Sequence, residues 1–229
     1  NLEYQSQAEL ETMVRTVVNE AIRQQVAQQP ETFTDRFTEL EQQRLQRLLL
    51  DWLSLERRRD DFRVIATEQW QSLVYQDIEL HLRVDRIDEL ADGRCVIIDY
   101  KTGVVRKSDW QTDTPHEPQL PLYAITSQQE VAAIAFASLK RGKLGFVGLA
   151  ADDDLLPNVK TSRDMDWQQQ LDEWQTVLTR LAQDFRNGKA TVEPTRIACR
   201  YCDLHALCRI HDRIESLDEL TAEELSDEA

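Results

Sequence analysis

The sequence predicts an α/β fold in which helices flank a central mixed β-sheet. Two observations carry this prediction. Apolar residues recur at helical spacing near both ends of the chain, whereas in the middle they alternate or form short continuous runs. The predicted order is two helices, three strands, one helix, two strands and one helix. This order is neither an internal repeat nor the regular strand–helix alternation of a doubly wound sheet.

Four segments have the periodicity of amphipathic helices, and each has a plausible end. Pro30 ends the first helix, and Arg57, Arg58 and Arg59 place positive charge at the end of the second, which favours a helix C-terminus. The pair Asn187-Gly188 is typical of a helix C-cap after the last one. The predicted helices span residues 3–28, 35–59, 118–127 and 163–186.

Five segments are predicted to be strands. The second alternates Ile78, Leu80, Leu82 and Val84 with polar residues, as a half-buried strand does. The third is a nearly continuous apolar run, which favours a central strand buried on both faces. A tight turn at 91–93 joins these two. The predicted strands span residues 62–68, 75–87, 94–101, 131–139 and 144–150.

Two carboxylates and a lysine come together in the predicted hairpin. A tight turn brings Asp85 close to Asp99, and Lys101 lies two residues after Asp99, on the same face of the strand. Charged groups at the end of a buried strand are costly unless they have a function. Carboxylate oxygens suit Mg²⁺ or Mn²⁺, and a bound metal activates water for attack on a phosphate. A solvated surface hairpin is the alternative for an isolated Asp-x-Lys pattern.

Three motifs in this order resemble the RecB-like branch of the PD-(D/E)XK nuclease superfamily. They are RVDRID at 83–88, VIIDYKTG at 96–103 and QLPLY at 119–123. The resemblance implies a restriction-endonuclease-like fold and metal-dependent DNA hydrolysis, with Asp85 and Asp99 as metal ligands and Lys101 as the catalytic lysine. Asp88 is the alternative first ligand. The resemblance also implies that Gln119 and Tyr123 line the DNA path and that Glu68 has a supporting role, unless Glu68 is simply a solvated strand end.

One feature of the family is missing. Many members have a metal-binding His on the helix before the first strand, and here no His precedes His81. The chain begins at Asn1 rather than Met. We therefore expect it to be a fragment, with the missing residue lying upstream or absent.

Three of the four cysteines, Cys199, Cys202 and Cys208, are spaced C-x2-C-x5-C. Clustered cysteines without a secretion signal favour a metal or iron–sulfur site over disulfides. The cluster resembles the C-terminal end of AddB-type nuclease domains, which implies a [4Fe–4S] cluster whose fourth cysteine would lie upstream. A zinc site completed by His205 or His211, and an empty site, are the alternatives. In this fragment an empty site is expected. Cys95 is predicted to be a core residue.

The acidic net charge is the main argument for alternatives to a nuclease. The net charge is −15, and eight acidic residues and one arginine after residue 211 supply −7 of it, leaving −8 for residues 1–211. An acidic chain repels DNA, which counts against nucleic-acid binding. The acidic charge and the missing His together favour a catalytically inactive DNA-end-binding or scaffolding module of the same fold. A third hypothesis is a module that binds a protein partner without DNA.

The preferred interpretation is an exonuclease-type deoxyribonuclease in DNA repair or recombination, attached to a helicase domain or subunit by family analogy. No segment has the length and apolarity of a membrane helix, and a cytoplasmic location is expected. The predicted organisation is a nuclease domain at 1–211, followed by an acidic tail at 212–229. Within the domain we expect N-terminal helices at 1–60, a catalytic core at 61–150, and a helix with the cysteine cluster at 160–211.

Overall fold

The computed structural model describes residues 6–161, 165–191, 199 and 202–208, and the chain divides into two compact units at 1–183 and 184–229. The predicted tail at 212–229 lies outside the described residues, so its boundary stays a prediction. Among the described helices, none combines the length and the apolarity that crossing a bilayer requires.

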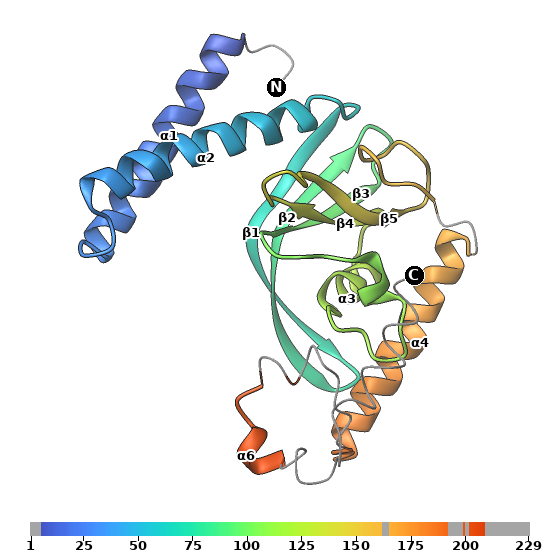
Figure 1. The fold of residues 1–229 in the computed structure, drawn as a ribbon. Helices are drawn as coiled ribbons and strands as arrows, with labels where there is room; N and C mark the ends of the chain where they lie inside the picture. The colour runs from blue at the N-terminus through green and yellow to red at the C-terminus, as the bar shows by residue number, and fades with distance from the viewer. Residues whose placement is uncertain (1–5, 162–164, 192–198, 200–201, 209–229) are drawn as a thin grey trace, which may run out of the picture. The chain divides into compact units, whose positions relative to one another are not determined.

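A five-stranded mixed sheet forms the centre of the first unit (Figure 1), which confirms the predicted fold class. The strand order follows the sequence, and every neighbouring pair is antiparallel except β3 and β4, which are parallel. The parallel pair needs a crossover, and α3 lies in it. The strands are β1 (Phe62–Tyr75), β2 (Ile78–Leu90), β3 (Cys95–Lys101), β4 (Val131–Ser138) and β5 (Gly145–Ala150).

The first hairpin is longer than predicted. Strand β1 continues to Tyr75, and β2 begins at Ile78, so the predicted strands at 62–68 and 75–87 were wrong at this boundary. The turn consists of Gln76 and Asp77, both with positive φ (49° and 59°). Two-residue hairpin turns with positive φ at both central positions usually contain Asn-Gly or Asp-Gly, and this pair lacks that sequence signal.

The helices of the first unit agree with the prediction in number and order and differ at their ends. Helix α1 starts with a capping box between Ser6 and Glu9, and Thr34 caps α2. The second helix stops at Glu56 rather than at residue 59, because Arg58 and Arg59 form a tighter i+3 turn with 3.1 Å N···O bonds. The α-helices are α1 (Gln7–Gln28), α2 (Asp35–Glu56), α3 (Gln119–Thr126) and α4 (Trp167–Arg186).

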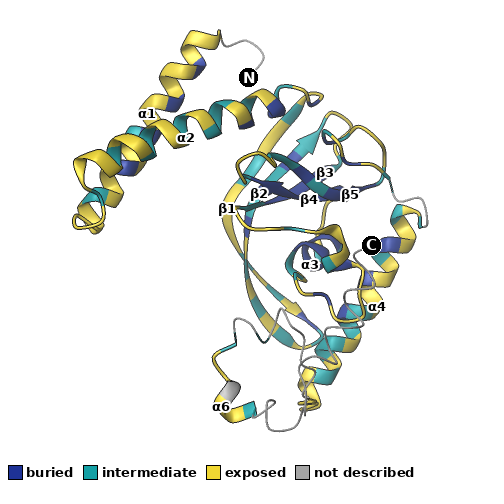
Figure 2. Cartoon of the chain, in the orientation of Figure 1, coloured by how far each residue is buried: buried dark blue, intermediate teal, exposed yellow. Residues whose placement is uncertain are grey.

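The core lies on both sides of β3, as Figure 2 shows by the burial of the central strands. On one side, Val96 and Ile98 pack in a cluster with Trp52 of α2. On the other, Ile97 packs in a cluster with Tyr123 of α3 and Trp174 of α4. The prediction that this strand is central and buried on both faces is confirmed, and so is the burial of Cys95, which is 1% exposed.

A close approach between β4 and β5 depends on Gly148. A Cβ at this position would lie 2.3 Å from the carbonyl oxygen of Ile134 and 2.8 Å from Cβ of Ala135. Backbone atoms cannot move away cheaply, so Gly148→Ala is expected to destabilise the domain by about 1–3 kcal/mol. Urea unfolding would measure the change. Gly145→Ala is the matched control, since nothing lies within 4 Å of its Cβ. An equal effect of both changes would contradict the packing argument.

The second unit contains the predicted C-cap and part of the cysteine cluster. Gly188 has φ of 70°, and its N–H donates to the carbonyl of Phe185 at 3.0 Å, which confirms the cap. The short helix α6 (His205–Cys208) includes the last cysteine.

Candidate active site

The candidate site lies where β2 and β3 separate. Their pairing ends at Arg86 opposite Ile98, so Asp85 and Asp99 are the first residues beyond the last pair. Asp85 Oδ2 accepts a hydrogen bond of 2.9 Å from the backbone N–H of Tyr100. This bond satisfies a strand amide that would otherwise pair with β2. The predicted proximity of the two aspartates is confirmed, and it follows from the point where the strands part.

Asp99 and Lys101 share one face of β3, as predicted. Lys101 Nζ lies 3.0 Å from Asp99 Oδ2 and 3.6 Å from Glu117 Oε2. Asp99 is buried at 6% exposure. The contact with Lys101 is an ion pair and not a well-aligned hydrogen bond, so Asp99 Oδ2 accepts no hydrogen bond from the residues that the structure describes. The Lys101 ammonium is thus the positive charge next to this oxygen.

The electrostatics of the pair follow from burial and neighbouring charge. Burial raises the pKa of Asp99, and the negative charges of Asp85 and Glu117 raise it further, while Lys101 lowers it. Burial alone would lower the pKa of Lys101, but Asp99 and Glu117 outweigh burial and raise it. Lys101 therefore carries its charge at neutral pH, whereas Asp99 holds a proton more readily than an ordinary aspartate.

Helix α3 brings Gln119 and Tyr123 to the same place. Gln119 Nε2 donates to the carbonyl of Arg83 at 2.8 Å, and it lies 3.4 Å from the Tyr123 hydroxyl. Burial raises the pKa of Tyr123, and the charges of Asp85 and Asp99 add to the increase. The Tyr123 hydroxyl is therefore close enough to both carboxylates for their negative charges to raise its pKa. The hydrogen bond from Gln119 to Arg83 connects α3 to β2 and positions the helix. The sequence pattern alone did not predict this contact.

Glu68 lies beside Asp85. The pairs Thr67–Arg86 and Gln69–Val84 place Glu68 across from Asp85 on the neighbouring strand. Glu68 has a positive φ of 49°. Both acidic residues line a hollow of about 390 Å³ next to Trp52 and Tyr100. Glu68 also forms an ion pair with Arg83.

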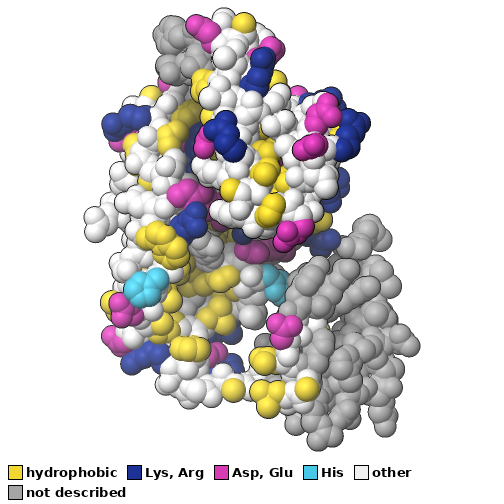
Figure 3. All heavy atoms as spheres, turned by 90° about the vertical axis from the view of Figure 1, so that its left-hand side faces the viewer, with side chains coloured by type: hydrophobic (Ala, Val, Ile, Leu, Met, Phe, Trp, Pro, Cys, Tyr) yellow, Lys and Arg dark blue, Asp and Glu magenta, His cyan; other side chains and the backbone are white. Residues whose placement is uncertain are grey.

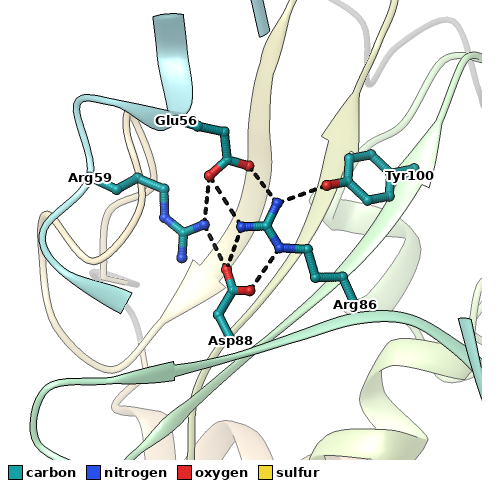
Figure 4. A network of polar contacts seen from close by, with 5 residues as sticks. All are labelled: Glu56, Arg59, Arg86, Asp88 and Tyr100. Carbon is teal, nitrogen blue, oxygen red and sulfur yellow. Dashed lines mark hydrogen bonds and ion pairs between the residues drawn. The ribbon is translucent and has the colours of Figure 1, made fainter. Parts of the chain in front are cut away.

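Asp88, the alternative ligand, belongs to a separate charge network (Figure 4). It is 0% exposed and lies 2.7 Å from the nearest guanidinium nitrogens of both Arg59 and Arg86. Glu56 completes the network, with contacts of 2.9 Å to Arg59 and 2.8 Å to Arg86. Two acids and two arginines balance each other, so the oxygens of Asp88 are already committed to cations. This placement favours Asp85 as the metal ligand.

The network also reaches the strand that carries the site. Arg86 Nη1 donates to the Tyr100 hydroxyl at 2.8 Å, and the backbone N–H of the same tyrosine holds Asp85. The end of α2 is thus linked to the candidate site through Arg86 and Tyr100. Sequence reasoning missed Glu56 and Arg59 because their partners lie about thirty residues away in the chain.

Comparison with known proteins decides the family. The chain matches the model of the family described as "PD-(D/E)XK nuclease superfamily" over residues 2–209. The chain belongs to this superfamily. A comparison with curated proteins gave no match. Members of the PD-(D/E)XK superfamily are generally nucleases, and they typically use divalent metal ions such as Mg²⁺.

The residues of this PD-(D/E)XK domain fit such an ion. Mg²⁺ is usually held by one or two protein carboxylates and completes its shell with water and substrate phosphate. Asp85 and Asp99 supply two carboxylates, and Asp99 Oδ2 has no hydrogen bond from the described residues. No group of three His, Cys, Asp or Glu side chains suitable for a metal occurs in the described part of the chain. No third ligand of this kind therefore takes the place of the family's histidine among these residues.

The cysteine cluster is only partly described. In the second unit, Cys202 N–H bonds to the carbonyl of Cys199 at 3.3 Å, and the N–H of Leu204 donates to Cys202 Sγ at 3.3 Å. All three cysteines have intermediate exposure. His211 lies outside the described residues, and so does the side chain of His205. The iron–sulfur, zinc and empty alternatives remain predictions.

Proposed function

We propose that this domain is a metal-dependent deoxyribonuclease of the RecB/AddB-like branch that hydrolyses DNA phosphodiesters in an exonuclease mode. The observation that carries the proposal is the ion pair between the buried Asp99 and the partly exposed Lys101, at the point where β2 and β3 separate, beside Asp85. Repair or recombination, and association with a helicase domain or subunit, extend the proposal by family analogy.

The proposed roles follow from the positions of the side chains. Asp85 and Asp99 would hold Mg²⁺ or Mn²⁺, and the bound ion would activate water and offset charge on the phosphate. The Lys101 ammonium, kept charged by Asp99 and Glu117, positions the attacking water and stabilises the negative charge that develops on the phosphate. Gln119 and Tyr123 form the side of the site on α3 and guide the strand.

The supporting role of Glu68 is assigned through its neighbours. Glu68 lies on β1, opposite Asp85 on β2, and it forms an ion pair with Arg83. We infer that this pair sets the charge at the entrance to the hollow beside Asp85. Cys199, Cys202 and Cys208 are proposed as [4Fe–4S] ligands. The hydrogen bond from Leu204 N–H to Cys202 Sγ supports this, because such bonds stabilise thiolates that bind metal.

The decisive experiment is the degradation of end-labelled linear DNA in Mg²⁺ or Mn²⁺, with EDTA as the metal-free reference. Lys101→Ala is expected to reduce cleavage by about 10²–10³-fold, the usual loss when one charge-stabilising group is removed. Lys143→Ala is the matched control, because Lys143 is exposed in the loop between β4 and β5. A closed circular DNA of the same sequence should resist cleavage if the enzyme requires an end.

Two results would contradict the proposal. If cleavage by the Lys101→Ala and Lys143→Ala variants is equal, the assigned site is wrong. If the chain binds DNA ends and cleaves nothing in either metal, the catalytically inactive DNA-end-binding module replaces the enzyme.

A further inference from the structure

An aromatic side chain on the outer face of the β1–β2 hairpin has no role in the proposed chemistry. Trp70 is 67% exposed on strand β1. Tryptophan is highly buried on average, whereas Trp70 is exposed and shares a groove with Gln119 of the candidate site. Figure 3 shows the molecule from the side of β1, where hydrophobic side chains are exposed among charged ones.

The surroundings of Trp70 are those of a stacking platform. Arg83 is its partner across the strands, and the guanidinium carbon lies 5.9 Å from the centre of the indole ring. Both residues line a groove of about 450 Å³, together with His81 of β2 and Pro118 and Gln119 at the start of α3. Gln119 thus borders this groove and also contacts Tyr123 in the candidate active site.

The groove lies next to the hollow beside Asp85. Arg83 lines the groove and pairs with Glu68, which lies across from Asp85 and lines the hollow with it. Arg83 lies about 7 Å along the strand from Asp85, because each residue advances a strand by about 3.4 Å. This distance is close to the spacing between neighbouring nucleotides in an extended strand. A base on Trp70 would therefore belong to a nucleotide next to the one being cleaved.

We propose that Trp70 and Arg83 form a stacking site for an unpaired base of single-stranded DNA, next to the metal site. The inference rests on the proposed function and adds the substrate form that the site accepts. Indole rings stack on the face of any base, and this face is accessible only when the base is outside a duplex. Arg83 supplies positive charge for the neighbouring phosphates, and its side chain is half-exposed, so a phosphate can compete with Glu68 for it.

Intrinsic fluorescence gives a direct test, because Trp70 is unlike the other tryptophans. Four of the five are buried or partly buried, namely Trp52, Trp110, Trp167 and Trp174. The exposed indole should dominate the long-wavelength emission. Oligo(dT) added in EDTA, where no cleavage occurs, is expected to quench this emission, and blunt duplex DNA of equal length is not.

Three variants separate stacking from other contributions. Trp70→Ala is expected to weaken oligo(dT) binding about tenfold, as measured by anisotropy of a labelled oligomer. Trp70→Phe keeps a stacking ring, so it should keep most of the affinity while losing the quench. Phe37→Ala removes an aromatic residue of α2 that is 41% exposed and should change neither signal.

The outcomes distinguish this inference from the proposed function. Metal-dependent cleavage without quenching, and with unchanged oligomer affinity in Trp70→Ala, overturns the stacking site and leaves the nuclease intact. Quenching by oligo(dT) without cleavage supports the stacking site and overturns the nuclease. Equal quenching by blunt duplex, or a preference for oligo(U) over oligo(dT), overturns the assignment to single-stranded DNA.

Discussion

Asp99→Asn is expected to abolish metal-dependent cleavage, with a loss of at least about 10³-fold, while the domain remains folded. The change removes one of the two carboxylates proposed to hold the metal. Stabilisation of transition-state charge by such a metal is worth several kcal/mol. Asparagine has nearly the same shape, and Lys101 keeps Glu117 as a partner at 3.6 Å. End-labelled DNA degradation measures the loss. Asp51→Asn, an exposed position on α2, is the matched control.

The pH dependence of stability gives a second readout for the same variant. Burial raises the pKa of Asp99, so the protonated form is favoured in the folded state. Its contribution to stability is present below the ordinary pKa of aspartate and is lost as the pH rises through the raised value. The metal-free wild type should therefore lose stability relative to Asp99→Asn as the pH rises from about 3 to neutrality. Thermal unfolding in EDTA measures this difference.

Metal binding should reverse that order. Mn²⁺ is expected to raise the melting temperature of the wild type and to have little effect on Asp99→Asn, because only a folded site with both carboxylates binds the ion. Equal stabilisation of both proteins by Mn²⁺ would show that Asp99 is not a ligand. A larger stability of the wild type in EDTA at neutral pH would contradict the cost assigned to burying this carboxylate.

Asp88→Ala is expected to have the largest effect on stability, a loss of about 3–5 kcal/mol in the free energy of unfolding. The change leaves Arg59 and Arg86 buried with Glu56 as their one remaining acidic partner in the network. Removing one partner of a buried ion pair is costly because the remaining charge stays out of water. Urea unfolding followed by circular dichroism measures the loss.

A surface pair provides the control for this prediction. Arg63 and Glu89 form an ion pair between β1 and β2, and the arginine side chain is 74% exposed. Arg63→Ala should therefore cost no more than about 1 kcal/mol. If Asp88→Ala costs no more than this control, the network is effectively hydrated and its proposed role in fixing Tyr100 and Asp85 is lost.

The parts of the site that could be predicted from the sequence are local. Asp99 and Lys101 are two residues apart on a strand, and strand geometry alone places them on one face. Asp85 is one hairpin away, so a single tight turn brings it close. The periodicity of the apolar residues likewise predicted the order of helices and strands, because burial of one face imposes that period.

The parts that could not be predicted depend on contacts between distant segments. Glu56 ends a helix and meets Arg86 thirty residues later, and no sequence spacing indicates that contact. The length of β1 was missed because its second half is an exposed strand in which polar residues hide the alternation. The platform at Trp70 becomes evident only when α3 is seen beside the hairpin.

The uneven lengths of the strands have a consequence for the order of folding. Strand β2 pairs with β1 along nearly its whole length, whereas only its residues 86–89 pair with β3. The long hairpin consists of contacts between residues near in sequence, which close quickly, while the parallel partner of β3 must arrive across a crossover. We therefore expect the β1–β2 hairpin to form early. Asp85 and Asp99 should come together only when β3 pairs with β2, so the chain is expected to gain its affinity for metal at the end of folding.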